Sequence, residues 1–229
     1  MVIGPFYALA IASLLSYTCS APAQQKEEAR PFPDYKLIPG KSLDEFNPTS
    51  AARLCLTDGS HKCFALPQLG KGNEAFFYYA KPTVRRVVAA SGETLVLFSA
   101  GFQGGSGGSD EYVLLRFQQG KLINLLPAIT LSNQSNHDLW DLPAISPMPL
   151  FVTADFLWED GAHYGDHHYQ IEVYSYDSQT SKYKRILRYR TPHRYRGFDN
   201  SEDDTVQVLR YERATIESKL ASLQSDSNQ

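Results

Sequence analysis

The residues of this chain best suited to chemistry are imidazoles and carboxylates that gather in one short segment. Both groups are ligands for a borderline divalent ion such as zinc, and a loop lets several of them converge. Residues 159–168, directly after an apolar run, contain Glu159, Asp160, His163, Asp166, His167 and His168. A metal site in this loop would use Glu159, Asp160, His163, Asp166 and His167.

Geometry favours an ordinary solvated loop over a metal site at 159–168. His167 and His168 point to opposite faces if both belong to the strand that follows, and the segment contains no HExxH motif. Structural zinc also needs about four converging ligands. We therefore expect no cofactor, keep a divalent metal as the alternative, and expect Glu159, His163 and His167 to contact a ligand from this loop.

A glycine-rich segment at 101–110, GFQGGSGGSD, is a second candidate contact region. A phosphate-binding loop would need a lysine and a helix N-terminus after it, whereas this segment runs into the strand-like EYVLLRF. Ser106 and Ser109 also lack the G-x-S-x-G context of a nucleophile. We therefore predict a hairpin loop, with residues 103–110 available to a partner.

Trp140 lies with His137 in the polar segment NQSNHDLWDLP. A tryptophan in such a segment is either a packed anchor or a platform on which a sugar stacks. We take the anchor as the main interpretation and keep Trp140 among the candidate ligand-binding residues.

Basic residues and tyrosines alternate from Lys182 to Arg196. This pattern can hold an anionic glycan, a lipid headgroup or a single nucleic-acid strand. The alternative is a solvated strand whose charges discourage edge aggregation, and it is the interpretation that we favour. A regular hairpin closed at 177–181 predicts buried pairs Ile171–Leu187 and Tyr169–Tyr189, and solvated pairs Tyr174–Lys184 and Gln170–Arg188.

The composition is that of one ordinary globular domain, with 229 residues of which 42% are hydrophobic and 21% charged. The formal net charge of -3 and the pI near 6.1 provide no overall attraction to a phosphate backbone. We therefore expect no nucleic-acid partner.

The N-terminus predicts export. An uncharged apolar run at 2–15 is followed by small residues ending in Ala21-Pro22-Ala23, so residues 1–23 resemble a secretory signal peptide cleaved before Gln24. The run is shorter than the roughly 20 apolar residues of a membrane span, and we expect no transmembrane span after cleavage. Lipidation of Cys19 is the minor alternative, because residues 16–18 lack the apolar approach sequence of a lipoprotein.

Cys55 and Cys63 are the even pair that remains after cleavage. The Asp58-Gly59 turn signal between them predicts a hairpin that brings the two sulfurs together. An oxidising compartment would let them form a disulfide.

Short apolar or alternating runs bounded by Gly, Pro, Asn or Asp recur from 51 to 190 and predict a mainly β domain. The spacing fits an antiparallel meander that forms a sandwich, a barrel or a small propeller-like domain. The period then changes to that of one amphipathic helix packed on the domain. Its predicted apolar face holds Val206, Leu209, Ile216, Leu220 and Leu223.

These features predict four segments: a signal peptide at 1–23, a Pro-rich extended leader at 24–50, one domain at 51–223 and a disordered tail at 224–229. The predicted function is that of an exported, periplasmic or secreted, non-catalytic binding or envelope-associated protein. Its loops 103–110 and 159–168 would contact an envelope or extracellular protein or a glycan. The alternative is a metal-dependent hydrolase whose His and carboxylate site lies in loop 159–168.

Overall fold

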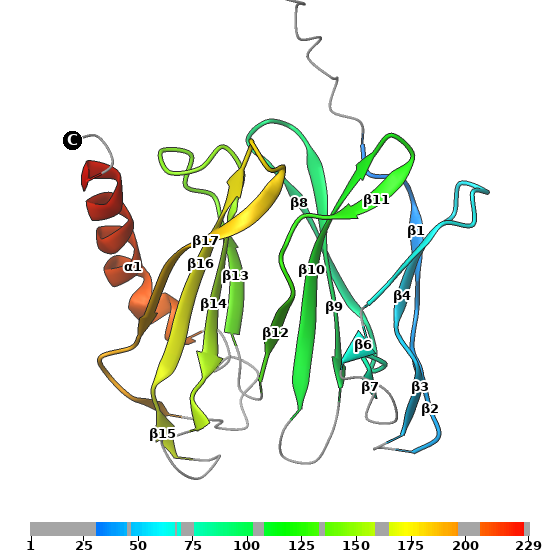
Figure 1. Cartoon of the computed structure of the whole chain (residues 1–229), viewed down its shortest axis with the longest axis horizontal. Coiled ribbons are helices and arrows are strands. Elements are labelled where there is room, and N and C mark those ends of the chain that lie inside the picture. The colour runs from blue at the N-terminus through cyan, green and yellow to red at the C-terminus, as the bar shows by residue number, and fades with distance from the viewer. Residues whose placement is uncertain are drawn as a thin grey trace, which may run out of the picture.

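Four layers stack side by side in the protein: three antiparallel sheets followed by one helix (Figure 1). The computed structural model describes residues 31–44, 47–66, 68–69, 76–102, 108–132, 136–158, 165–196 and 207–226. The predicted signal peptide at 1–23 lies outside these residues. The layers confirm a mainly β sandwich with one C-terminal helix, and the sheets formed by the described residues do not close into a barrel.

The first sheet has the order β1-β4-β5, the second β11-β10-β9-β8 with β12 also paired to β10, and the third β13-β14-β16-β17. The strands of the first sheet are β1 (Tyr35–Ile38), β4 (Arg53–Leu56) and β5 (Cys63–Ala65). Those of the second are β8 (Thr83–Val88), β9 (Thr94–Phe102), β10 (Ser109–Gln118), β11 (Lys121–Asn124) and β12 (Ile129–Leu131). Those of the third are β13 (Asn136–Trp140), β14 (Leu150–Phe156), β16 (Tyr169–Asp177) and β17 (Lys182–Arg190). Three small ribbons pair β2 (Lys41–Ser42) with β3 (Pro48–Ser50), β6 (Gln68–Leu69) with β7 (Phe76–Phe77), and β15 (Asp166–His167) with β18 (Tyr195–Arg196).

Strand β9 of the second sheet packs against both neighbouring sheets. Its apolar residues alternate between two cores: Leu95 and Leu97 face the third sheet, whereas Val96 and Phe98 face the first. All four side chains are buried. A strand covered on both faces is a continuous apolar run rather than an alternating one, as the TLVLF sequence shows.

The N-terminal region joins the fold earlier than the sequence predicts. Strand β1 pairs with β4 along its whole length, and Phe32 is buried in the core between the first two sheets. The segment predicted as an extended leader at 24–50 therefore packs on the domain from Phe32 onward. Aromatic and apolar residues among the prolines provide the physical reason, because they bury enough surface to order the arm.

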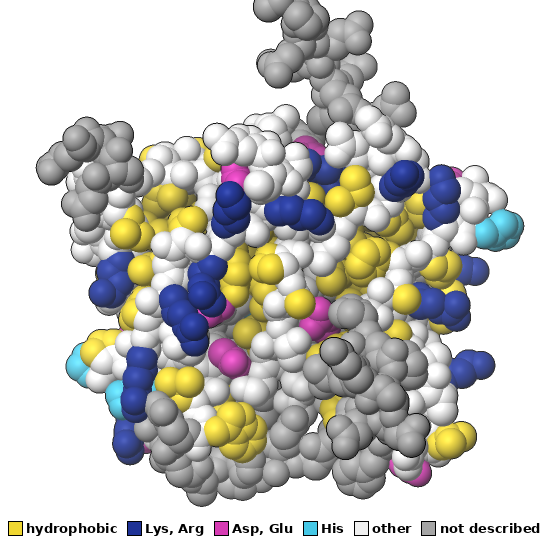
Figure 2. Space-filling model, in the orientation of Figure 1, with side chains coloured by type: hydrophobic (Ala, Val, Ile, Leu, Met, Phe, Trp, Pro, Cys, Tyr) yellow, Lys and Arg dark blue, Asp and Glu magenta, His cyan; other side chains and the backbone are white. Residues whose placement is uncertain are grey.

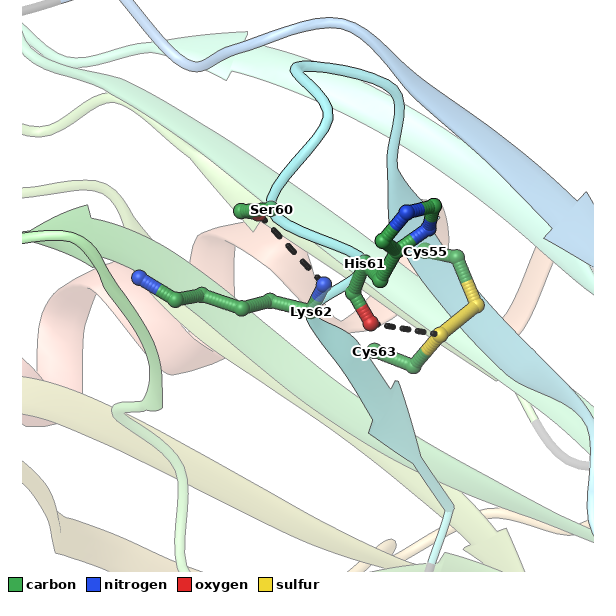
Figure 3. Close-up of a disulfide and its surroundings, with 5 residues drawn as sticks. All are labelled: Cys55, Ser60, His61, Lys62 and Cys63. Atoms are coloured by element: carbon green, nitrogen blue, oxygen red, sulfur yellow. Dashed lines mark hydrogen bonds between the residues drawn. A yellow bond between two sulfur atoms is a disulfide. The ribbon is translucent and has the colours of Figure 1, made fainter.

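The disulfide between Cys55 and Cys63 is confirmed. The two residues lie directly opposite each other on β4 and β5, and Gly59 adopts a φ of 80° in the connecting turn. Asp58 accepts a hydrogen bond from the backbone N of Ser60 at 2.9 Å, which closes the turn. Figure 3 shows the Lys62 side chain pointing away from the disulfide, and its Nζ donates to the carbonyl of Gly120 at 2.6 Å.

Helix α1 (Gln207–Asp226) covers the outer face of the third sheet. Leu209, Ile216 and Leu220 are buried there as predicted, whereas Leu223 is 44% exposed. The helix continues through residue 226, into the segment at 224–229 that is predicted as a tail, and residues 227–229 lie outside the described part of the chain. No helix of the described part of the chain is long and apolar enough to cross a membrane.

The β16–β17 hairpin departs from the regular pairing. The turn pairs Asp177 with Lys182 and so places Tyr174 opposite Arg185, and a register shift between Val173 and Tyr174 then places Ile171 opposite Tyr189. Tyr174 is buried against the second sheet, which corrects its predicted place on a solvated face. The extra residue accepted at the bulge is a local feature that hydrophobic pattern alone does not specify.

Candidate functional site

The structure separates the predicted metal ligands that it describes. Glu159, Asp160 and His163 lie outside the described residues. Asp166 is exposed, whereas its neighbour His167 is fully buried with its ring 4.1 Å from that of Phe156. Among the described residues, no group of three or more His, Cys, Asp or Glu side chains could hold a metal ion.

Trp140 is a packed anchor between β13 and α1. Its side chain is 5% exposed, its Nε1 donates a 2.9 Å hydrogen bond to Asp138, and the guanidinium of Arg213 lies 4.9 Å from the ring centre. The Arg213 guanidinium therefore covers the face of the indole ring that is turned toward the helix. Trp140 is therefore not a free stacking platform for a sugar.

The glycine-rich loop is described only at its ends. Residues 103–107 lie outside the described part, and β9 and β10 pair up to Phe102 and Ser109 on either side, as expected for a hairpin. At this end Asp110 lies over Gly101, where a Cβ would overlap the Asp110 carboxylate. Burial raises the pKa of Asp110 above its ordinary value.

Basic side chains gather over the third sheet on the face seen in Figure 2, with acidic groups among them. Arg185 and Arg188 both reach the Glu172 carboxylate, at 2.8 and 3.3 Å. Lys184 pairs with Asp177. Part of the positive charge of β17 is thus balanced by its partner strand β16.

A different set of polar residues converges on a cavity of about 180 Å³ between the second and third sheets. Strands β8, β9 and β13 form its walls. The lining consists of Thr83, Val84, Arg85, Leu97, Ser99 and His137. We refer to this space as the intersheet cavity.

Strand register brings two hydroxyls together in the intersheet cavity. Thr83 on β8 lies directly opposite Ser99 on β9, and their hydroxyl oxygens are 2.6 Å apart. Ser99 stands where the alternation of β9 would otherwise place a third apolar residue facing the third sheet. The two hydroxyls therefore form a polar spot in an apolar wall.

An imidazole on β13 completes the cavity, and an ion pair between Arg85 on β8 and Asp138 on β13 joins the two sheets beside it. His137 lies on the edge strand β13, with its ring 4.2 Å from that of Tyr112. Burial, and then the nearby Arg85 cation, lowers the pKa of His137 to about 4, with Asp138 opposing the shift. Arg85 pairs with Asp138 at 3.2 Å. At neutral pH the imidazole is uncharged and the ion pair cancels, so the cavity has donors and acceptors without net charge.

Sequence reasoning placed His137 in a loop and gave no role to Thr83, Arg85 or Ser99. Alternation in NHDLW was the available signal for a strand, because it places His137 and Leu139 on one face and Trp140 on the other. The convergence on β8 and β9 depends on how two sheets stack, and no local pattern specifies it.

We compared the chain with models of protein families, with curated proteins and with solved structures. None of these comparisons finds a match.

Proposed function

We propose that this chain is an exported, non-catalytic binding protein that holds a neutral, hydroxyl-rich group, such as the end of a glycan, in the intersheet cavity. The observation that carries the proposal is the Thr83–Ser99 hydroxyl pair facing an uncharged His137 beside the Arg85–Asp138 pair. The partner is an envelope or extracellular glycan.

The polar groups of the cavity suit a sugar because a sugar hydroxyl both donates and accepts hydrogen bonds. The Arg85 guanidinium donates, the uncharged imidazole of His137 donates from one nitrogen and accepts at the other, and the hydroxyls of Thr83 and Ser99 can do either. A charged ligand would gain little, since Arg85 is already paired.

The volume of the intersheet cavity limits the size of the group that it can hold. Ligand pockets for whole drug-sized molecules measure roughly 300–1,000 Å³, whereas the intersheet cavity measures about 180 Å³. We therefore expect one terminal unit of a longer molecule to enter. In this proposal loop 103–110 contacts the rest of the ligand, and support comes from β9 and β10, which pair as far as Phe102 and Ser109. Loop 159–168 follows β14, whose Ala154 pairs with Asn136 beside His137, and it belongs to the same proposal.

Export is supported by the Cys55–Cys63 disulfide, since such bonds persist in oxidising compartments. A periplasmic or secreted location follows from the same proposal, with a lipid anchor at Cys19 as the minor alternative. The alternative, a metal-dependent hydrolase that uses loop 159–168, requires His167 to bind metal.

The test is a screen of neutral mono- and disaccharides by saturation-transfer NMR, followed by titration calorimetry. Ser99→Ala removes one hydroxyl from the cavity and should weaken binding about 3- to 10-fold, the effect of one neutral hydrogen bond. Ser178→Ala, in the exposed β16–β17 turn, is the matched control and should bind as the wild type does. Absence of saturable binding, or equal losses in the two variants, would overturn the proposal.

A further inference from the structure

A second, larger cavity lies at the first sheet, away from the intersheet cavity. It measures about 530 Å³ and is bordered by strands β2, β3, β4 and β5. Its lining consists of Lys41, Thr49, Ser50, Ala51, Arg53, Ala65 and Leu66. This volume falls within the range of small-molecule pockets. We call it the basic groove.

The described lining of the basic groove carries positive charge only. Its charged residues are Lys41 and Arg53, and none of the described lining residues is a carboxylate. Within the described ranges, neither side chain forms an ion pair, in contrast to Arg85 with Asp138 and Arg116 with Glu93. Two unpaired cations in one concave surface create a positive potential that attracts an anion.

The backbone around the groove is held rigidly. A Cβ at Gly40 would overlap the Cα of Tyr79 and the carbonyl oxygen of Ser50, so the chain before Lys41 packs directly on its neighbours. The backbone N of Lys41 donates to the Ser50 hydroxyl at 3.1 Å. These contacts fix the base of the Lys41 side chain.

Arg53 is fixed from the other side. It pairs with Ala65 in the β4–β5 register, and the disulfide joins the same two strands two residues further along. The backbone N of Leu66 donates to the carbonyl of Ala52 at 3.1 Å. Because the backbone that carries both cations is already ordered, less conformational entropy is lost when a ligand binds between them.

We propose that the basic groove binds a small organic anion, with its phosphate or carboxylate group between Arg53 and Lys41 and its apolar part against Ala51, Ala65 and Leu66. The planar guanidinium of Arg53 can donate two parallel hydrogen bonds to such an oxyanion, and Lys41 adds a point charge. The hydroxyls of Thr49 and Ser50 supply further donors. The apolar lining distinguishes this ligand from an inorganic ion.

The probes are hexyl phosphate, hexanoate and inorganic phosphate, titrated into the whole protein at low salt and followed by calorimetry. Hexyl phosphate and hexanoate should bind saturably, and hexyl phosphate should bind more tightly than inorganic phosphate. Arg53→Gln and Lys41→Gln should each weaken binding about tenfold, the effect of losing a charged hydrogen bond at a solvated site. Added salt should weaken it further.

Lys36→Gln provides the matched control. Lys36 is an exposed cation on β1 of the same sheet and is not part of the groove lining. This variant makes the same charge change, so it should retain wild-type affinity. Melting curves of the variants establish that they fold.

Three outcomes would overturn the proposal: no saturable binding of any probe, equal affinity for hexyl phosphate and inorganic phosphate, or an equal loss in Lys36→Gln. A result in which only the two groove variants lose affinity would support it. The sugar screen of the intersheet cavity uses neither of these cations, so the two proposals succeed or fail separately.

Discussion

The phenol of Tyr189 donates a 2.7 Å hydrogen bond to Glu212, a carboxylate that is only 2% exposed on the sheet side of helix α1. Tyr195 donates to the other carboxylate oxygen. The helix is therefore joined to the third sheet by a polar contact inside an apolar face. Such a contact is stabilising only while both partners remain in place.

Replacement of Glu212 by alanine should lower the free energy of unfolding by about 1–3 kcal/mol, because two half-buried phenols lose their acceptor. Urea denaturation measures the loss. Glu217→Ala is the control, since Glu217 pairs with Arg213 on the exposed face of the same helix and should change stability by less than about 0.5 kcal/mol. Similar losses in unfolding free energy in both variants would show that the hydrogen bonds to Glu212 do not stabilise the protein more than an exposed ion pair does.

Glu212 also marks the limit of sequence reasoning about this fold. Apolar periodicity identified the helix and most of its buried face, because burial of Leu209, Ile216 and Leu220 follows directly from their spacing. The position of Glu212 within the apolar face does not predict that tyrosines of the third sheet will form hydrogen bonds to it. The contact depends on tertiary position, as the intersheet cavity does.

The strands likewise include features that the sequence predicts and features that it does not. Short apolar runs and turn residues predicted the β16–β17 hairpin and the disulfide hairpin, both of which are local. The shift at Val173/Tyr174 is a local bulge that the hydrophobic pattern does not specify, and the contact of His137 on β13 with Tyr112 of the second sheet depends on tertiary packing, so neither could be predicted. The cavity residues Thr83, Ser99 and His137 were missed for this reason, whereas the loop ligands were proposed from adjacency alone.

Acidic pH should destabilise the protein through His137. Its folded-state pKa is lowered to about 4 from an ordinary value of 6.5 by burial and by Arg85. The unfolded chain therefore binds the proton first, so the stabilisation is complete above about pH 6.5 and is lost as the pH falls toward 4. A shift of this size corresponds to roughly 3 kcal/mol.

Urea denaturation of the wild type and of His137→Gln at about pH 7 and pH 4.5 tests this effect. Carboxyl groups titrate in both proteins, so the difference between the two pH dependences isolates His137. The variant should lose less stability on acidification than the wild type. His61→Gln, at the exposed tip of the β4–β5 hairpin, should behave as the wild type; identical curves for all three proteins would contradict the prediction.

Alkaline pH should act through buried tyrosines. Burial, assisted by the charge of Asp155, raises the pKa of Tyr169 to about 12. The stabilisation is therefore present below about pH 10, where the unfolded phenol begins to ionise, and is lost as the pH rises toward 12. Tyr169→Phe should reduce the fall in unfolding free energy between about pH 8 and pH 11 by roughly 1–2 kcal/mol. The same slope in Tyr169→Phe as in the control Tyr211→Phe, whose phenol is 62% exposed, would refute it.

Reduction of the disulfide should destabilise the protein locally. Cys55 and Cys63 close a short loop with a sequence separation of 8, for which the chain-entropy model gives about 2–3 kcal/mol. Cys55→Ser/Cys63→Ser should unfold at correspondingly lower urea. Mass spectrometry of alkylated peptides checks the bond itself, and two alkylated cysteines at these positions without reductant would contradict it.

His167 separates the structural interpretation from the metal-dependent alternative. The side chain is fully buried beside Phe156, so His167→Ala should leave a cavity and lower the free energy of unfolding by about 2–4 kcal/mol. Exposed Asp166 provides the matched variant, and Asp166→Ala should change stability little. If instead the two residues bind metal, both variants should lose bound zinc measured by elemental analysis, and the wild-type melting temperature should fall with chelator. We expect the first pattern, because Asp166 is exposed while the His167 side chain is packed inside the protein.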